Sequence, residues 1–348
     1  MAITRVTIDA FLKLGAQYPI FDVRSPSEYS HAHIPGALSL PLFSDEERKW
    51  VGTAYKQESK QKAIKIGLKY FGTNMVQLVE QVETILKKLP ANLSPDIILV
   101  HCWRGGMRSA GVAWLLDLYG FKVYTLAGGY KIYRTWVLEQ FNKPYPIEIV
   151  GGYTGSGKTE VLKELKQRGQ QVIDLEALAN HKGSAFGNMG EPEQPTQEQF
   201  ENLLAKELVL ANNTIWMEDE SQRIGKVNIP TTLFKQMRTK RVLFMDIAFE
   251  ERLNHILKTY GKFEKEKLVN AIIRIKKRLG GLETKTAINF LLEDDIQGCF
   301  TILLKYYDRV YTAGSQKRDN PHELIYKIPC NKVNSLVNAI QLIEITAS

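Results

Sequence analysis

The stretch that decides the fold of this chain is IEIVGGYTGSGKT, residues 147–159. Its first part, Ile147–Val150, is a short apolar run that predicts a buried strand, and its second part, Gly152–Thr159, has the spacing of a phosphate-binding loop. Glycines let the main chain turn its N–H groups inward, and the start of the following helix adds the positive end of its dipole. A strand, this loop and a helix together predict an α/β domain built around a phosphate site.

The glycine-rich loop predicts a site for a di- or triphosphate. Lys158 would neutralise the terminal phosphate, and Thr159 would be a ligand of Mg²⁺ if the ion is used. The loop identifies phosphates rather than bases, so by itself it leaves the nature of the ligand open. Main-chain N–H groups would hold the phosphate oxygens, and the residues expected to take part are Gly152, Gly155, Ser156, Gly157, Lys158 and Thr159.

A metal-side carboxylate is expected at the end of a strand next to this loop. Glu218 and Asp219 follow the apolar run Thr214–Met217 and are the strongest candidates, with Asp174 and Asp246 as alternatives. Acidic clusters also occur as solvated strand ends. The sequence therefore assigns no metal ligand firmly.

A second anion-binding loop, HCWRGGMRS at residues 101–109, lies upstream. It follows the apolar run Ile97–Val100 and leads into an apolar helix expected at Ser109–Tyr119. Main-chain N–H groups of the glycine turn, together with Arg104 and Arg108, would stabilise the thiolate of Cys102 and hold an oxyanion beside it. Because such a thiolate can attack phosphorus, sulfur or selenium, Cys102 is the predicted nucleophile.

The chain is expected to form two α/β domains, at residues 1–140 and 141–348. The prolines of segment 142–146 interrupt both helix and strand and mark a linker. Before it, strands are expected at 20–23, 97–100 and 122–126, and helices at 77–87 and 109–119, as in a parallel sheet covered by helices. Beyond it, strands are expected at 147–150, 172–175, 214–217 and 241–246, and the region 265–311 has helical spacing.

The composition is typical of a soluble, cytoplasmic protein. Of the 348 residues, 44% are hydrophobic and 24% are charged, and no apolar run reaches the roughly 18 residues that would span a membrane. Three cysteines fit a reducing compartment; Cys299 and Cys330 are expected to be ordinary thiols, and no Cys/His set has zinc-ligand spacing. The net charge of +8 permits binding to nucleic acid without requiring it.

The first domain resembles the rhodanese family. The segments DVRSPSEY (22–29), HIPGA (33–37), the Cys102 loop and LAGG (126–129) match successive motifs of that family in order. The Cys-x5-Arg spacing from Cys102 to Arg108 is one residue longer than in sulfurtransferase rhodaneses. It is similar to that of dual-specificity phosphatases built on the same fold, whose loop also follows a histidine, as His101 does here. The longer loop implies an anion larger than persulfide chemistry needs.

Over nearly its whole length, the chain resembles the tRNA 2-selenouridine synthase family. The segments that carry this resemblance are CWRGGMRS (102–109), GYTGSGKT (152–159), HKGSAFG (181–187), EDES (218–221) and IG (224–225). The resemblance implies a rhodanese-like parallel-sheet domain followed by a P-loop NTPase-like α/β domain with a helical C-terminal part. His181 and Ser184, in one of these segments, are candidates for substrate contact, although a histidine in a Gly/Ser loop is as often structural.

The resemblance implies that the chain converts the wobble 2-thiouridine of certain tRNAs to 2-selenouridine. Geranyl diphosphate first alkylates the sulfur, and selenium from selenophosphate then displaces the S-geranyl group. We interpret Lys158 and the loop amides as stabilising the departing diphosphate without nucleotide hydrolysis, and Cys102 as the residue that carries selenium. No tightly bound cofactor is implied, Mg²⁺ is optional, and an enzyme that produces selenophosphate is a candidate partner.

Two basic helical segments are candidate tRNA-binding surfaces. Runs of this kind are more often solvated helix faces than binding sites, so the salt dependence of tRNA binding is the expected test. One segment contains Lys56, Lys60, Lys62, Lys65 and Lys69, with Tyr55 and Tyr70 as stacking partners, and the other contains Arg274, Lys276, Lys277 and Arg278.

Two other functions fit parts of the sequence. A rhodanese-fold phosphatase or sulfurtransferase fused to a small-molecule kinase would show ATP turnover by the second domain. The second alternative is a non-catalytic tRNA-binding protein. It would have no use for an intact Cys102, Arg108, Lys158 and Thr159, and the presence of all four favours an enzyme.

Overall fold

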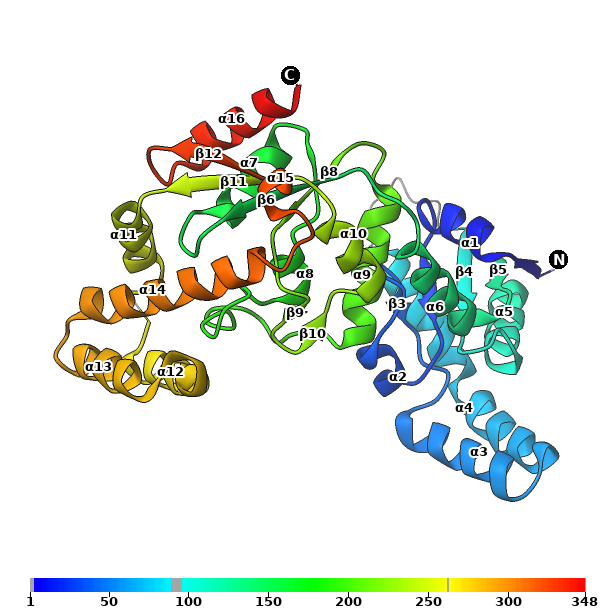
Figure 1. Ribbon diagram of the computed structural model, residues 1–348. Helices are drawn as coiled ribbons and strands as arrows, with labels where there is room; N and C mark the ends of the chain where they lie inside the picture. Colours follow the sequence, from blue (N-terminus) through cyan, green and yellow to red (C-terminus); the bar gives the residue numbers. More distant parts are fainter. Residues whose placement is uncertain (1–2, 89–95, 262, 348) are drawn as a thin grey trace. The chain divides into compact units, whose positions relative to one another are not determined.

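The computed structural model describes residues 3–88, 96–261 and 263–347. The chain divides into two compact units, Met1–Gln140 and Phe141–Ser348. Each unit is a parallel sheet with helices packed around it, which confirms the predicted α/β class (Figure 1). The segment 142–146 lies between the last helix of the first unit and the first strand of the second.

The central strand of the sheet in the first unit leads directly into the cysteine loop. The five parallel strands of this sheet run in the order β1 (Thr4–Val6), β5 (Lys122–Leu126), β4 (Ile97–His101), β2 (Ile20–Asp22) and β3 (Leu38–Ser39). Because helices cover both faces of a parallel sheet, its central strand is apolar up to His101, and Ile98, Leu99 and Val100 are fully buried. Cys102 therefore directly follows the carboxyl end of a buried central strand.

The helices of the first unit include one that is much longer than expected. They are α1 (Ile8–Gly15), α2 (Pro26–His31), α3 (Asp45–Gln57), α4 (Lys60–Leu86), α5 (Met107–Tyr119) and α6 (Gly129–Gln140). The helix expected at 77–87 is the C-terminal third of α4, whose first part is Lys-rich and has few buried residues. Residue 87 is the C-cap of α4. Helix α3 and the start of α4 project from this unit as a helical hairpin (Figure 1).

The sheet of the second unit places the phosphate loop at its centre. Its five parallel strands run in the order β12 (Ile325–Cys330), β11 (Val242–Ile247), β6 (Ile147–Gly152), β8 (Ile215–Glu218) and β7 (Gln171–Val172). A short hairpin of β9 (Arg223–Ile224) and β10 (Val227–Asn228) lies apart from it. Ligands of such sheets bind beyond the carboxyl ends of the strands, where the loop after β6 lies.

Helices pack around this sheet, and some of them form a separate helical part of the unit. They are α7 (Lys158–Gln167), α8 (Leu175–Ala179), α9 (Gln197–Leu210), α10 (Thr231–Arg238), α11 (Phe249–Tyr260), α12 (Lys265–Leu279), α13 (Gly281–Leu292), α14 (Ile296–Ser315), α15 (Pro321–Leu324) and α16 (Ser335–Ala347). The strand expected at 172–175 is wrong beyond Val172. Asp174 caps α8 instead, because its Oδ1 accepts a hydrogen bond from the N–H of Ala177 at 2.8 Å.

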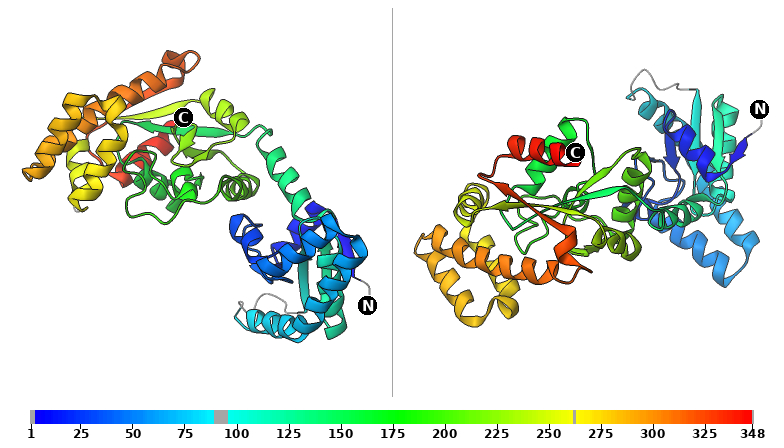
Figure 2. Two further views of the ribbon diagram at one scale, coloured as in Figure 1. Left: turned by 90° about the horizontal axis from the view of Figure 1, so that it is seen from below. Right: turned by 45° about the horizontal axis from the view of Figure 1, so that its top comes forward.

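The region expected to be helical, 265–311, forms α12, α13 and most of α14. These helices and α11 lie together at one end of the second unit (Figures 1 and 2). Their facing sides form a separate apolar core that includes Leu253, Leu268, Leu291 and Phe300. A second core under the sheet contains Trp216 and Leu243. The unit thus has a P-loop sheet and a helical part, each with its own packed interior.

Candidate functional site

The cysteine loop connects β4 to α5, and glycines set its shape. Gly105 has φ of +60°, and a Cβ there would meet the carbonyl of Leu126. Gly129 has φ of +62°, and a Cβ there would collide with the main chain of Cys102. The N–H of Tyr130 donates to the carbonyl of Cys102 at 2.8 Å. The LAGG segment is therefore the floor against which the loop is folded.

The thiol of Cys102 is buried beside groups that favour its ionisation. Its Sγ lies 3.2 Å from the Oγ of Ser109, and the side chain is only 3% exposed. Burial opposes ionisation, but the Ser109 hydroxyl, the charge of Arg108 and the N–H groups of Ser109 and Arg104 outweigh it and lower the pKa of the thiol. Cys102 is thus a candidate nucleophile in thiolate form.

The two arginines of the loop act differently from expectation. Arg108 donates to Glu28 of α2 at 2.7 Å, and its charge stabilises the thiolate from that position. The Arg104 side chain is exposed, and only its main-chain N–H acts on the thiol. The predicted ring of two guanidinium groups is therefore one guanidinium group and the loop amides.

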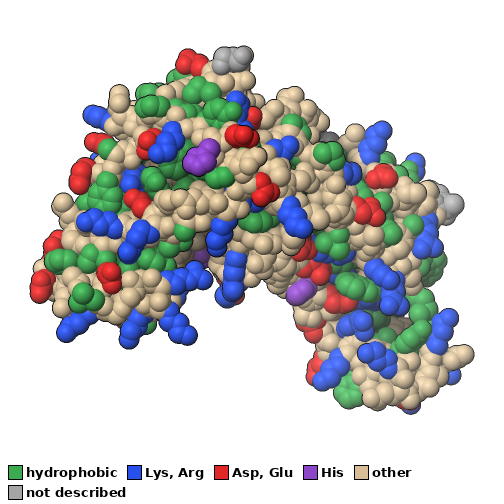
Figure 3. Space-filling model, viewed as in Figure 1, with side chains coloured by type: hydrophobic (Ala, Val, Ile, Leu, Met, Phe, Trp, Pro, Cys, Tyr) green, Lys and Arg blue, Asp and Glu red, His purple; other side chains and the backbone are tan. Residues whose placement is uncertain are grey.

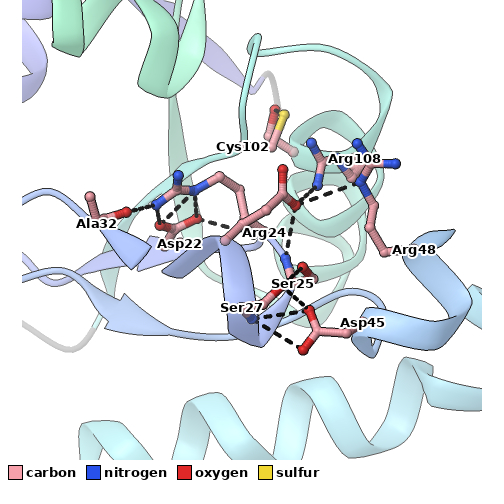
Figure 4. A network of polar contacts seen from close by, with 11 residues as sticks. Asp22, Arg24, Ser25, Ser27, Ala32, Asp45, Arg48, Cys102 and Arg108 are labelled. Carbon is pink, nitrogen blue, oxygen red and sulfur yellow. Dashed lines mark hydrogen bonds and ion pairs between the residues drawn. The ribbon is translucent and has the colours of Figure 1, made fainter. Parts of the chain in front are cut away.

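A buried ion pair supports the loop from the neighbouring strand (Figure 4). Asp22 binds the guanidinium of Arg24 with both oxygens, at 2.6 to 3.0 Å, and Arg24 also donates to the carbonyl of Ala32. The Arg24 guanidinium lies 3.8 Å from the centre of the Tyr130 ring. Since a buried ion pair is stabilising only with its remaining hydrogen bonds satisfied, this cluster fixes the loop geometry.

His101, the histidine before the cysteine, is a buried neutral group. Burial lowers the pKa of its imidazole, and the nearby Asp22 only partly opposes this effect. The ring packs against Phe11 and Tyr130. Among the described residues, neither of its ring nitrogens has a hydrogen-bond partner. The histidine therefore positions strand β4 rather than exchanging protons at the surface.

The phosphate loop has the geometry that the sequence predicts for an anion cradle. Gly155 and Gly157 have φ of +83° and +76°, in the left-handed region that favours glycine. The Nζ of Lys158 donates to the carbonyl of Gly152 at 2.9 Å, so the ammonium lies across the loop. The Ser156 hydroxyl is buried and has no hydrogen-bond partner among the described residues. These groups form a concave, positive site at the start of α7.

Carboxylates gather beside the loop, and one of them was not predicted. Glu176 accepts from the hydroxyl of Thr159 at 3.1 Å, and its N–H donates to Glu218 at 2.8 Å. Burial, and then the neighbouring carboxylates, raise the pKa of Glu218 well above its usual range. Burial and Glu176 raise the pKa of Glu220 to about 8. These carboxyls are therefore harder to ionise than isolated ones.

Asp219, the other predicted metal-side carboxylate, is engaged within the protein. One oxygen accepts from the hydroxyl of Tyr311 at 2.7 Å, and the other binds the buried guanidinium of Arg318. Tyr311 in turn accepts from the N–H of Gly152 at 3.4 Å. In residues 3–88, 96–261 and 263–347, no group of three or more His, Cys, Asp or Glu side chains is arranged to hold a metal ion. The remaining alternative, Asp246, is exposed on β11.

A cavity of about 1160 Å³ opens from the phosphate loop. One end is lined by residues 154–159, with Glu176 and Glu220 beside them. The other end is lined by apolar and aromatic side chains, among them Phe186, Tyr260, Ile275, Phe300, Leu303, Leu304 and Tyr307. Sequence patterns identified the polar end. The apolar end comes from α11, α12 and α14, whose side chains carry no motif.

The two residues singled out in the 181–187 segment differ in place. Ser184 lines the cavity, whereas His181 is outside its lining. Cβ atoms at Gly187 and Gly225 would each come within 2.7 Å of the His181 ring, so the two glycines enclose it. His181 is consequently the packing centre that joins this segment to the β9–β10 turn.

The basic residues predicted to bind tRNA are exposed on three helices. Lys56 lies on α3 and Lys60, Lys65 and Lys69 on α4. Arg274, Lys277 and Arg278 lie on one face of α12, and Arg278 also lines the cavity. Figure 3 shows Lys and Arg side chains gathered over α12 and α13. The α12 face is therefore continuous with the rim of the phosphate cavity.

The other two cysteines are buried packing residues. Burial raises the pKa of Cys299 to about 12 and that of Cys330 to about 11. Cys299 packs in the helical core and Cys330 under the sheet.

No helix in the described part of the chain is both long enough and apolar enough to cross a membrane.

Comparison with known proteins assigns the chain to a family. Residues 7–135 match the rhodanese-like domain family, and residues 145–340 match the family described as the tRNA 2-selenouridine synthase AAA domain. The tRNA 2-selenouridine synthase of Bdellovibrio bacteriovorus is 33% identical, over 91% of this chain and 94% of its own. That of Shewanella pealeana is 34% identical, over 86% of this chain and 90% of its own.

One solved structure matches a shorter part of the chain. It is the N-terminal domain of a putative ATP/GTP binding protein from Clostridium difficile 630, which is 37% identical over 39% of this chain and 99% of its own, with a TM-score of 0.35. The relatives that match most of the chain and the two matched domain families indicate the same protein family. The chain belongs to the tRNA 2-selenouridine synthase family, whose members are transferases that modify tRNA with selenium.

Proposed function

We propose that this enzyme converts the wobble 2-thiouridine of tRNA to 2-selenouridine in two steps in the cytoplasm. Geranyl diphosphate alkylates the sulfur, and selenium from selenophosphate then replaces the S-geranyl group. The observation that carries the proposal is the cavity that joins an anion cradle at Gly152–Thr159 to an apolar chamber. Such a cavity is complementary to a molecule with a diphosphate at one end and a hydrocarbon chain at the other.

The first step belongs to the phosphate loop. The thiocarbonyl sulfur attacks C1 of the geranyl group, the C1–O bond breaks, and diphosphate leaves with the bonding electrons while the base loses its N3 proton. Negative charge develops on the departing diphosphate. The loop amides and Lys158 are positioned to stabilise it, and charge stabilisation of this kind is usually the largest contribution to catalysis.

The second step belongs to Cys102. We propose that its thiolate, a nucleophile beside an oxyanion site, attacks the phosphorus of selenophosphate. An S–P bond forms, the P–Se bond breaks, and selenide leaves with the bonding electrons; water later cleaves the S–P bond and releases phosphate. Selenium then forms a bond to C2 of the base, the C2–S bond breaks, and geranyl thiol leaves. Alkylation in the first step prepares this exchange, because a thioether is a better leaving group than a thiocarbonyl sulfur.

The proposal is tested by mass spectrometry of wobble nucleosides. The full chain is incubated with 2-thiouridine tRNA and geranyl diphosphate, and then with selenophosphate. S-geranyl-2-thiouridine is expected after the first incubation and 2-selenouridine after the second. Unchanged 2-thiouridine would contradict the proposal, and ATP turnover by the protein alone would favour the kinase alternative.

Two variants assign the steps to the two loops. Cys102→Ser is expected to keep geranylation and to lose selenation. Lys158→Ala removes a charged group from the diphosphate and is expected to slow geranylation by about 10- to 100-fold. It should keep selenation of RNA that is already geranylated. Lys163→Ala is the matched control, because this lysine lies in the cavity but outside the loop. Loss of geranylation in Cys102→Ser would refute the assignment.

A further inference from the structure

Helix α14 runs along the cavity from its polar end to its apolar end. Four of its cavity-lining residues, Tyr311, Tyr307, Leu304 and Phe300, are spaced three or four positions apart and so lie on one face. Tyr311 marks the polar end, since its hydroxyl contacts the N–H of Gly152 and its ring centre lies 6.0 Å from the Lys158 Nζ. Distance into the cavity can therefore be counted in helical turns of α14, starting from Tyr311 at the phosphate loop.

Helix α11, which packs against α14, keeps the same order. On α11, Ile256 lies against the loop, because a Cβ on Gly155 would come within 2.8 Å of its Cγ1. Tyr260 follows one turn later, away from the loop. Both side chains line the cavity. The hydrocarbon walls of α11 and α14 thus begin directly at the phosphate cradle.

Three aromatic rings meet where these walls end. The ring of Phe300 lies 6.0 Å from that of Phe186 and 6.2 Å from that of Tyr260, and Phe186 and Tyr260 are 6.1 Å apart. All three line the cavity and are less than a tenth exposed. Phe300 is eleven residues from Tyr311, which at the rise of an α-helix is about 16 Å. The aromatic cluster therefore lies three turns from Tyr311 on α14 and one turn from Ile256 on α11, and it bounds the apolar end.

The length of this chamber limits the hydrocarbon that it accepts. Each isoprene unit adds four carbons to the main chain of a prenyl diphosphate, roughly the length of one helical turn. With the diphosphate at the loop, a first unit would pass Tyr307 and a second would pass Leu304. A third unit would meet Phe300.

We propose that Phe300, held by Phe186 and Tyr260, closes the chamber and restricts the alkyl donor to two isoprene units. This inference rests on the proposed function and adds the residue that selects chain length. Two substitutions on the α14 scale follow from it. Phe300→Ala lengthens the chamber by removing the end wall, and Leu304→Phe shortens it by one turn.

The test compares donors of different length on the full-length protein. The ratio of kcat/KM for farnesyl diphosphate to that for geranyl diphosphate is measured with 2-thiouridine tRNA. Phe300→Ala is expected to raise this ratio at least 10-fold. Leu304→Phe is expected to lower kcat/KM for geranyl relative to dimethylallyl diphosphate by a similar factor. Leu291→Ala is the matched control, because Leu291 belongs to the same helical core but lies outside the cavity lining.

Binding measurements separate failure of this inference from failure of the proposed function. Calorimetry compares inorganic pyrophosphate, geranyl diphosphate and farnesyl diphosphate. If the wild type binds geranyl diphosphate more tightly than pyrophosphate but transfers nothing, the proposed reaction fails while the chamber stands. Equal binding of these two ligands would overturn the chamber. An unchanged farnesyl-to-geranyl ratio in folded Phe300→Ala, in both kinetics and binding, would overturn the role of Phe300.

Discussion

The guanidinium of Arg108 lies 2.7 Å from the carboxylate of Glu28, so the arginine that closes the cysteine loop is held by a helix from the start of the chain. This ion pair keeps a positive charge near the thiol of Cys102 and helps to lower its pKa. Glu28 is itself fixed, because it accepts from the N–H of Ser25 at 3.2 Å. The reactivity of Cys102 therefore depends on a residue that no cysteine-loop motif includes.

Substituting Arg108 is expected to make Cys102 less reactive at neutral pH. Without the positive charge the thiolate is less stable, so the midpoint of the pH profile for iodoacetamide alkylation should move to higher pH. The rate is followed by peptide mass spectrometry of Arg108→Gln. Arg104→Gln is the comparison, because its exposed side chain leaves the main-chain N–H in place; a larger shift in that variant would contradict this assignment.

Much of each site could be predicted because its residues lie in one short segment of the sequence. The glycines, Cys102 and Arg108 of the first loop, and Lys158 and Thr159 of the second, are local patterns after apolar strands. Glu176, Tyr311 and Phe300 could not be found this way. They reach the P-loop site from α8 and α14, and their side chains have no periodic or spacing signal that distinguishes a lining residue from a core residue.

Two errors in the predicted elements have physical causes. The full length of α4 was not predicted, because its basic first part, expected only as a separate helical segment, buries too few residues to show an apolar stripe that continues into 77–87. Asp174 was assigned to a strand although an Asp directly before a helix is a strong N-cap signal. In the first case the information lies in tertiary structure, and in the second it was present in the sequence.

His101 is expected to make the first unit less stable as the pH falls. Its pKa is lowered in the folded state, so the unfolded chain takes up the proton first, below about pH 6.5. The free energy of unfolding should then decrease by at most about 1.4 kcal/mol per pH unit below that value. Asp22 moderates the effect, and Arg24 and His33 strengthen it.

The measurement is hydrogen exchange of β4 peptides between pH 7 and 5, after correction for the intrinsic exchange rate. His101→Asn should show a shallower loss of protection than the wild type over this range, even if it is less stable at pH 7. His322→Asn, at an exposed position of α15 in the other unit, is the control and should retain the wild-type slope of the β4 peptides. Identical slopes in all three proteins would show that His101 does not carry the pH dependence.

Gly155 is expected to be indispensable for the phosphate loop, and Gly169 offers a matched comparison. Both have a positive φ, of +83° and +79°, so alanine at either costs about 1–2 kcal/mol of backbone strain. A Cβ at Gly155 also comes within 2.9 Å of the Arg252 carbonyl, whereas a Cβ at Gly169 meets no atom within 4 Å. Gly155→Ala should therefore lose more stability in urea and also lose pyrophosphate affinity. Equal losses in both variants would contradict the close packing of the loop on α11.

The basic face of α12 is expected to contribute more to tRNA binding than the basic face of α4. Arg274, Lys277 and Arg278 adjoin the rim of the cavity in which the base would react. Each lysine or arginine that contacts a phosphate releases counterions from the RNA on binding, and this release makes the affinity depend on salt. Replacing all three residues by alanine should therefore make the slope of log K against log salt concentration less steep by about two. Filter binding of 2-thiouridine tRNA at several salt concentrations measures this slope.

The triple substitution of Lys62, Lys65 and Lys69, which share one face of α4, removes the same charge from the other unit. A smaller change is expected there, because Lys62 is already paired with Glu58. If the α4 variant shows the larger change, tRNA binds across the helix hairpin of the rhodanese-like unit instead. If neither slope changes, both basic faces are solvated surfaces, and the cavity rim must hold the RNA through groups such as Lys182 and Lys235, which line the cavity outside α12.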